Sequence, residues 1–95
     1  MKLLFVIYDS GIDETLTKTL NEHGIKGYTK IFDSHGLGGT GFKDGTPVFP
    51  GMNNVLLVSL PAESVQSFLD CLKKLKRSYK INPGITVYSL DAQEL

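Results

Sequence analysis

Two short stretches decide the fold of this 95-residue chain: Leu3-Leu-Phe-Val-Ile-Tyr8 and Asn54-Val-Leu-Leu-Val-Ser-Leu60. Each is an apolar run of strand length, as expected for a strand that is covered on both faces. Two further runs mix apolar and polar residues: Gly27-Tyr-Thr-Lys-Ile-Phe32 and Ile85-Thr-Val-Tyr-Ser-Leu90. Such mixed runs are typical of strands nearer a sheet edge. We therefore expect a sheet with the two apolar strands at its centre.

A helix is expected between the first and second strands. The apolar residues Ile12, Leu16 and Leu20 recur every four positions and form a narrow stripe on one helix face. Ser10 precedes the stripe and can cap a helix start, and Gly24 follows it as a residue that ends helices. The pattern therefore predicts a helix between Ser10 and Gly24.

A second helix is expected to open at Pro61, because proline is favoured in the first helical turn. One wide apolar face follows along this helix: Val65, Phe68, Leu69, Leu72 and Leu75. The order of elements is β-α-β-β-α-β, and right-handed crossovers would place both helices on one face of the sheet. This order predicts a ferredoxin-like α+β sandwich, an antiparallel sheet with two helices on one face. The other sheet face would be apolar, so we expect other subunits to bury it.

The composition limits the kind of protein. The length predicts a single domain over residues 1–95. Ten acidic and ten basic side chains give no formal net charge, so bulk electrostatics favours neither nucleic acid nor a membrane surface as partner. The apolar run at the N-terminus is short for a signal peptide, and no run reaches the ~20 residues of a membrane span. One cysteine excludes an internal disulfide framework, and we expect a cytoplasmic protein.

Between Asp33 and Asn54 the chain shows no hydrophobic periodicity, and six of its ten glycines lie from Gly36 to Gly51. Long stretches of this kind are usually functional or disordered. The stretch His35-Gly-Leu-Gly-Gly-Thr-Gly41 has successive backbone amides that can surround a phosphate. Its spacing is that of neither a dinucleotide fingerprint nor a P-loop. The residues alone leave two interpretations open: an anion-binding loop or a flexible hairpin connection.

Three other groups of residues are candidates for chemistry. Asp33 and His35 suit a divalent metal, although two ligands need completion from another subunit, and an exposed loop histidine is the alternative. Lys80 lies in a Pro-Gly turn beyond the second helix, where it can reach a ligand phosphate. Cys71 has no histidine near it in sequence, so we interpret it as a buried structural thiol. We find no Ser/His/Asp arrangement and no paired carboxylates, and we expect no enzyme.

Three stretches resemble the PII-like signalling proteins, the superfamily of nitrogen regulatory protein P-II and CutA: Gly24-Ile-Lys-Gly-Tyr-Thr29, His35-Gly-Leu-Gly-Gly-Thr-Gly41 and Ser78-Tyr-Lys-Ile-Asn-Pro-Gly84. The first is similar to the family's entry into the second strand. The second is similar to the base of its T-loop, and the third to the B-loop that wraps nucleotide phosphates. The resemblance covers most of the chain, as a divergent and short member with residues 33–53 as its T-loop. It implies a trimer that binds nucleotide in clefts between subunits.

The resemblance also implies which residues lie at or beside the ligand: Gly36, Gly38, Gly39, Thr40, Gly41, Lys80, Ile81 and Gly84. Three departures from the family pattern bear on affinity. Gly39 and Thr40 stand where family members have an arginine and a glutamine, although the threonine hydroxyl can still donate a hydrogen bond. Asn82 stands where the family has a glycine that contacts phosphate, and Ile85 stands where it has a lysine. Each lost cationic contact would cost about 1.5–3 kcal/mol, so nucleotide binding would be weaker by orders of magnitude.

The function implied by the resemblance is that of a homotrimeric regulator. It would bind a small effector, such as an adenine nucleotide, and dock a transporter or metabolic enzyme through its glycine-rich segment. The alternative is a metal-responsive trimer similar to CutA and to PII-like proteins of heavy-metal efflux systems, with a divalent metal on Asp33 and His35. A ferredoxin-like enzyme such as an acylphosphatase ranks last, because the arginine-bearing phosphate loop is absent.

Overall fold

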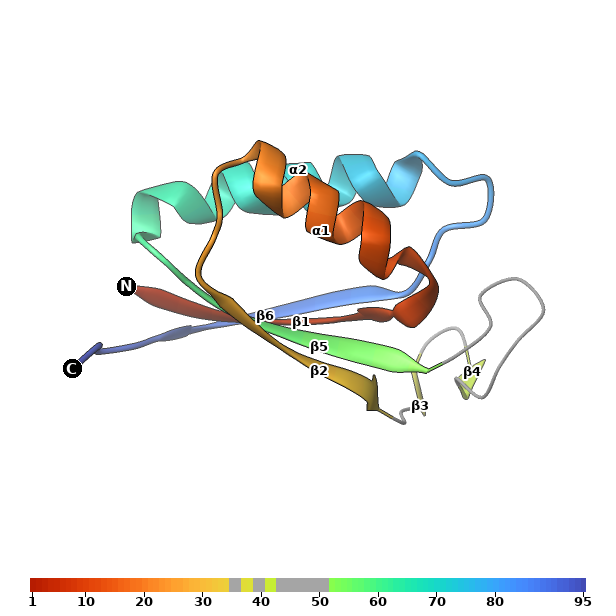
Figure 1. Cartoon of the computed structure of the whole chain (residues 1–95), viewed down its shortest axis with the longest axis horizontal. Helices are drawn as coiled ribbons and strands as arrows, with labels where there is room; N and C mark the ends of the chain where they lie inside the picture. The colour runs from red at the N-terminus through yellow and green to blue at the C-terminus, as the bar shows by residue number, and fades with distance from the viewer. Residues whose placement is uncertain (35–36, 39–40, 43–51) are drawn as a thin grey trace.

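The computed structural model describes residues 1–34, 37–38, 41–42 and 52–95. Four antiparallel strands form the main sheet, in the order β2-β5-β1-β6 (Figure 1). Their bounds are Lys2–Asp9 for β1, Tyr28–Ser34 for β2, Asn53–Leu60 for β5 and Ile85–Asp91 for β6. The two apolar strands are central and the two mixed strands lie at the edges, as predicted.

A second, two-stranded sheet lies inside the stretch that shows no hydrophobic periodicity. Its strands are β3 (Leu37–Gly38) and β4 (Gly41–Phe42), paired antiparallel. Each is only two residues long and contains a glycine. Strands so short leave no periodic pattern in a sequence, because period-two alternation needs several residues to be recognised.

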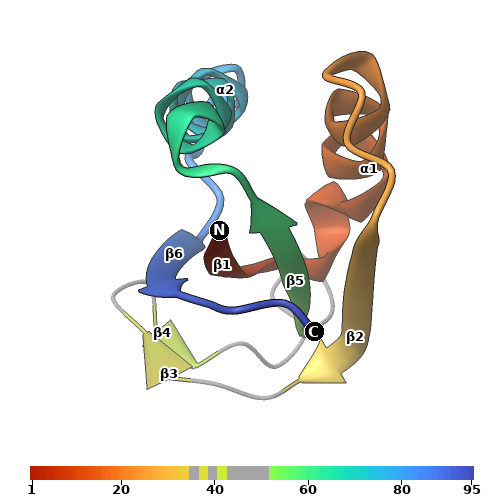
Figure 2. The same ribbon diagram turned by 90° about the vertical axis from the view of Figure 1, so that its left-hand side faces the viewer.

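Both helices pack on one face of the main sheet (Figure 2). Helix α1 spans Asp13–Glu22 and helix α2 spans Val65–Arg77. Alternate side chains of the central strands are buried on this face: Leu4, Val6 and Tyr8 in β1, and Leu56, Val58 and Leu60 in β5. The apolar stripes of the helices complete the core: Ile12, Leu16, Leu20, Phe68, Leu72 and Leu75, with Val65 and Leu69 packed against them. The ferredoxin-like α+β sandwich is therefore confirmed.

The helices begin later than the sequence predicts. Ser10–Ile12 forms a 3-10 turn, α1 starts at Asp13, and neither has a side-chain cap, so the prediction that Ser10 caps the helix is wrong. Pro61 precedes another 3-10 turn, Ala62–Ser64, rather than opening α2 itself. Gly24 does follow α1, with a φ of +70° that disfavours any residue with a side chain. Of the helices in the described ranges, none is long and apolar enough to cross a membrane.

Neither helix covers the opposite face of the main sheet (Figure 2). The strand register places two rows of apolar side chains across that face: Leu57, Phe5 and Tyr88 in one, and Ile31, Val55 and Ile7 in the next. At the two edges, Tyr88 is 60% exposed and Ile31 is 50% exposed. The face that was predicted to need cover is thus apolar and open in the single chain. We call these six residues the open sheet face.

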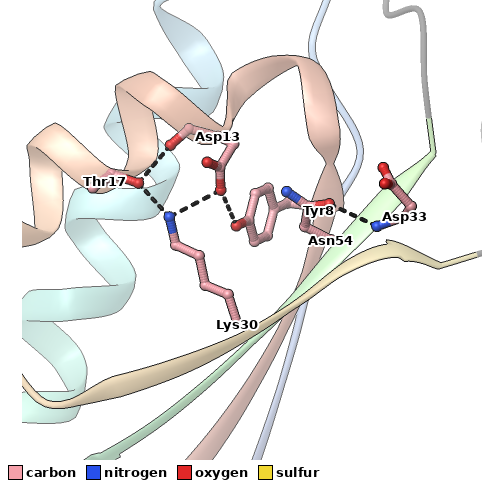
Figure 3. A network of polar contacts seen from close by, with 6 residues as sticks. All are labelled: Tyr8, Asp13, Thr17, Lys30, Asp33 and Asn54. Atoms are coloured by element: carbon pink, nitrogen blue, oxygen red, sulfur yellow. Dashed lines mark hydrogen bonds and ion pairs between the residues drawn. The ribbon is translucent and has the colours of Figure 1, made fainter.

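A polar network joins α1 to the sheet (Figure 3). The buried Tyr8 hydroxyl donates to Oδ1 of Asp13 at 2.5 Å, and Lys30 Nζ lies 3.0 Å from the same oxygen. Lys30 also donates to the Thr17 hydroxyl, which in turn donates to the Asp13 carbonyl at 2.8 Å. Burial and the bond to Asp13 raise the pKa of Tyr8. Burial alone would raise the pKa of Asp13, but the Tyr8 hydroxyl and the Lys30 ammonium lower it below its usual value.

Asp13 should make the stability depend on pH in acid. Because its pKa is lower in the folded state, its contribution is complete above the ordinary value of 3.8 and is lost as pH falls through the folded-state pKa. At neutral pH, Asp13→Asn should lower the free energy of unfolding by about 1–2 kcal/mol, since the lost hydrogen bonds are charge-assisted and partly exposed. Urea unfolding at one protein concentration should show this difference shrinking below about pH 4.

The matched control is Asp70→Asn, an exposed carboxylate on α2. This variant should change the free energy of unfolding by less than about 0.5 kcal/mol throughout the pH range. A loss in Asp13→Asn that stays constant down to about pH 2 would contradict the assigned role of the carboxylate.

Candidate functional site

The candidate site lies at the end of the main sheet where β1 and β2 stop and β5 and β6 begin. The connection between α2 and β6, which carries Lys80, Ile81 and Gly84, is at this end, and so are β3 and β4 (Figure 1). Gly38 belongs to β3 and Gly41 to β4. The other predicted residues lie outside the described part of the chain: His35, Gly36, Gly39 and Thr40.

The turn that carries Lys80 has one buried side chain and several exposed ones. Pro83 is among the fully buried side chains, whereas Ile81 is 57% exposed and Lys80 is exposed. A buried proline limits the motion of the turn, because its φ is fixed and its ring is packed. The turn therefore presents a cation to solvent from a firmly held backbone.

The end of β1 holds this turn in place. The Asp9 amide donates to the Gly84 carbonyl at 3.1 Å, and the Gly84 amide donates to Oδ2 of Asp9 at 2.5 Å. The next amide, that of Ser10, donates to the Met52 carbonyl at 2.7 Å. Asp9 thus binds the turn that carries Lys80, and its neighbour Ser10 binds Met52, the residue before β5. No motif in the sequence marks Asp9 for this role, because it directly follows an apolar run; its side chain is only 1% exposed.

On the β2 side, Asp33 begins the glycine-rich segment. The pairing of β2 with β5 is irregular between Ile31 and Ser34, and Asp33 has a φ of +58°, in the left-handed region. Its amide donates to Oδ1 of Asn54 at 3.1 Å, and Asn54 is 2% exposed (Figure 3). A buried side-chain acceptor therefore stabilises a backbone conformation that non-glycine residues disfavour.

The predicted metal pair cannot be assembled from the described residues. Asp33 is exposed and His35 lies outside them. Among the residues that the structure describes, no group of three or more His, Cys, Asp or Glu side chains could hold a metal ion. The pair of Asp33 and His35 stays a prediction.

Cys71 differs from its predicted environment. Its thiol is partly exposed rather than buried, and its Sγ lies 2.5 Å from Nε2 of His23. The two residues are 48 positions apart, so the residues next to Cys71 in the sequence give no sign of this contact. Burial raises the pKa of the Cys71 thiol, with Lys74 acting in the opposite direction. A raised pKa disfavours the thiolate that a nucleophile needs.

A shallow hollow of about 390 Å³ lies at the other end of the sheet. It is bordered by the connection between α1 and β2, the end of β5 and the start of α2: His23, Gly24, Ile25, Lys26, Gly27, Ser59, Leu60, Ser64, Ser67 and Phe68. None of the predicted ligand-binding residues is among them. The hollow and the Lys80 turn are therefore separate features at opposite ends of the molecule.

No family model and no curated protein matches the chain. Solved structures do. CPII, a nitrogen regulatory PII-like protein from Thiomonas intermedia K12, bound to ADP, AMP and bicarbonate, is 22% identical, with a TM-score of 0.70 over 94% of this chain and 84% of that chain.

Two further structures of CPII agree with the first. A second complex with ADP, AMP and bicarbonate has 21% identity and a TM-score of 0.71, over 97% of this chain and 93% of that one. A complex with ADP, AMP and acetate has 20% identity and a TM-score of 0.69, over 98% and 88%. The chain therefore has the fold of the PII-like proteins, which confirms the resemblance at the level of the fold.

Proposed function

We propose that this protein is a PII-like regulator that binds an adenine nucleotide beside the Lys80 turn. The observation that carries the proposal is the position of this turn. An exposed lysine on a backbone anchored by Pro83 lies at the same end of the sheet as the glycine strands β3 and β4. The CPII complexes support the choice of ligand, since they contain ADP and AMP on the same fold.

The chemistry of the turn suits binding rather than catalysis. Lys80 supplies a point charge, and glycine amides supply directional donors for phosphate oxygens. Residues 78–84 contain no histidine and no carboxylate that could act as a general base. With Asn82 and Ile85 in place of a glycine and a lysine of the family, we expect an affinity in the micromolar to millimolar range.

We further propose that the protein is a trimer whose subunits bury the open sheet face. Large apolar side chains on a sheet face are unfavourable in water, and a second and third copy of the same surface would remove them from it. In such an assembly the glycine-rich segment of one subunit would approach the Lys80 turn of a neighbour. The effector would then be held between two chains.

Effector binding would control a protein partner, either a transporter or a metabolic enzyme, that docks on the glycine-rich segment. Such coupling needs a ligand and a partner that share one segment, whose ordering changes when the ligand binds. The single cysteine suits a reducing compartment, and we place the protein in the cytoplasm.

A metal-responsive trimer is the second candidate. The observation in its favour is Asp33, an exposed carboxylate whose backbone is fixed at a φ of +58°. Carboxylate and imidazole ligands from three subunits could together complete a site for a divalent ion. A rise in melting temperature with a divalent metal, lost in Asp33→Asn and absent with nucleotides, would favour this candidate.

The trimer should dissociate when the open sheet face becomes charged. Wild type should scatter light as three times the chain mass of 10.4 kDa at micromolar concentration. Tyr88→Lys places a charge on a side chain that is 60% exposed in the single chain, so it should give a folded monomer. Gln66→Lys, on the exposed side of α2, should stay trimeric. A wild-type monomer would contradict the proposed assembly.

Nucleotide binding should depend on the Lys80 ammonium. Calorimetry should detect ADP binding to wild type, and Lys80→Ala should weaken it by roughly ten- to a hundredfold, because a charge-assisted contact is lost. Lys73→Ala removes an equal charge from the exposed surface of α2 and should change the affinity by less than about twofold. If wild type gives no heat at millimolar ADP, the nucleotide proposal fails.

A further inference from the structure

The Cys71 thiol and the His23 imidazole meet between the two helices. Cys71 lies within α2, and His23 directly follows α1. Sγ of the cysteine lies 2.5 Å from Nε2 of the histidine. They are the only cysteine of the chain and one of its two histidines. The proposed nucleotide site, at the other end of the sheet, uses neither side chain.

The core fixes the backbone positions of both residues. Leu20, three positions before His23, is 0% exposed, and Leu72, next to Cys71, is 4% exposed. The His23 amide also donates to the Thr19 carbonyl at 3.1 Å, which holds the end of α1. The thiol and the imidazole therefore extend toward each other from two helices whose separation is set by packed side chains.

A thiol paired with an imidazole is a donor set for a soft metal ion. Thiolate ligands select Cu(I), zinc and iron–sulfur clusters, and imidazole suits zinc, copper, iron and nickel. Zinc sites in proteins have three or four protein ligands. In the described ranges, however, no group of three or more His, Cys, Asp or Glu side chains could hold an ion. A soft monovalent ion such as Cu(I) is satisfied by two such donors, so it fits this pair best.

The surroundings leave room for an ion. Metal–sulfur bonds of about 2.3 Å and metal–nitrogen bonds of about 2.0 Å would separate the two donor atoms to about 4 Å. The His23 side chain is exposed and borders the hollow of about 390 Å³, so it can turn outward without disturbing the core. Burial raises the pKa of the Cys71 thiol, but a bound metal ion replaces the thiol proton and needs no preformed thiolate.

We propose that His23 and Cys71 bind a soft monovalent metal ion, Cu(I), between α1 and α2. Binding forms one metal–sulfur bond and one metal–nitrogen bond and releases the thiol proton to solvent. The site is separate from the Lys80 turn and does not depend on the proposed nucleotide function. Because both helices lie on the side of the sheet away from the open sheet face, each subunit of a trimer would carry its own ion.

The test measures Ag(I) binding to the reduced protein in chloride-free buffer. Ag(I) serves as the probe because it shares the charge of Cu(I) and its preference for sulfur and nitrogen donors, and it needs no reductant in air. Glutathione, a thiol without an imidazole, competes for the ion at increasing concentration. The silver that remains with the protein is then counted after desalting. Wild type should bind one ion per chain.

Two variants remove one donor each. His23→Asn should lose its ion at a glutathione concentration at least about tenfold lower than wild type, because a second donor held nearby raises the effective concentration of ligand. Cys71→Ser should bind no Ag(I) once glutathione is present, and Cys71→Ala replaces it if that variant does not fold. The affinity of all these variants for ADP should stay within about twofold of wild type.

The matched control is Glu22→Gln, an exposed side chain next to His23, which should keep its ion within about twofold of the wild-type glutathione concentration. If His23→Asn holds Ag(I) as firmly as wild type, the thiol alone binds the ion and the inference is overturned. Retention of the ion by Cys71→Ser would also overturn it. So would loss of the ion in His35→Asn, because the donors would then lie in the glycine-rich segment.

Discussion

Strand β1 is the element on which the rest of the structure depends. It pairs with β5 along its whole length and with β6 along most of it, so both halves of the chain are joined through it. Its inner side chains, among them Tyr8, fill the core beneath the helices. Its end, at Asp9 and Ser10, fastens the Lys80 turn and Met52. Strand β1 and the residue after it, Ser10, therefore contribute to the core, to the open sheet face and to the candidate site.

Much of the fold could be predicted because it depends on patterns within short segments. Apolar runs predicted the positions of the strands, and their composition distinguished the central strands from the edge strands. Gly24 marked the end of α1. The features that the sequence did not predict are mainly contacts between residues far apart in the chain. Asp9 and Gly84 are 75 positions apart, and alternation of apolar and polar residues says which face a side chain takes but not which partner it meets. The Ser10 prediction failed for a local reason, since a 3-10 turn before α1 moved the helix start to Asp13.

The candidate site combines fixed ends with a glycine-rich sequence between them. Asn54 holds the Asp33 amide on one side, and Ser10 holds the Met52 carbonyl on the other. The network around Asp13 and Lys30 lies beside these anchors and ties α1 to the same region of the sheet (Figure 3). A ligand that binds the glycine-rich segment would thus bind between two points at which the backbone is hydrogen-bonded to the main sheet and its adjoining residues. The proposed regulation requires this arrangement. A ligand-induced change in the glycine-rich segment can alter partner binding only if the rest of the domain keeps its structure.

The central claim, that an adenine nucleotide binds at the Lys80 end of the sheet, is tested most directly by amide NMR of the assembled protein during a titration with ADP. We predict that the amide signals of Gly38, Gly41 and Gly84 shift together along one saturation curve. The signals of residues 23–27, which line the hollow at the other end, should stay in place. Shifts confined to that hollow, or no shifts at millimolar ADP, would contradict it.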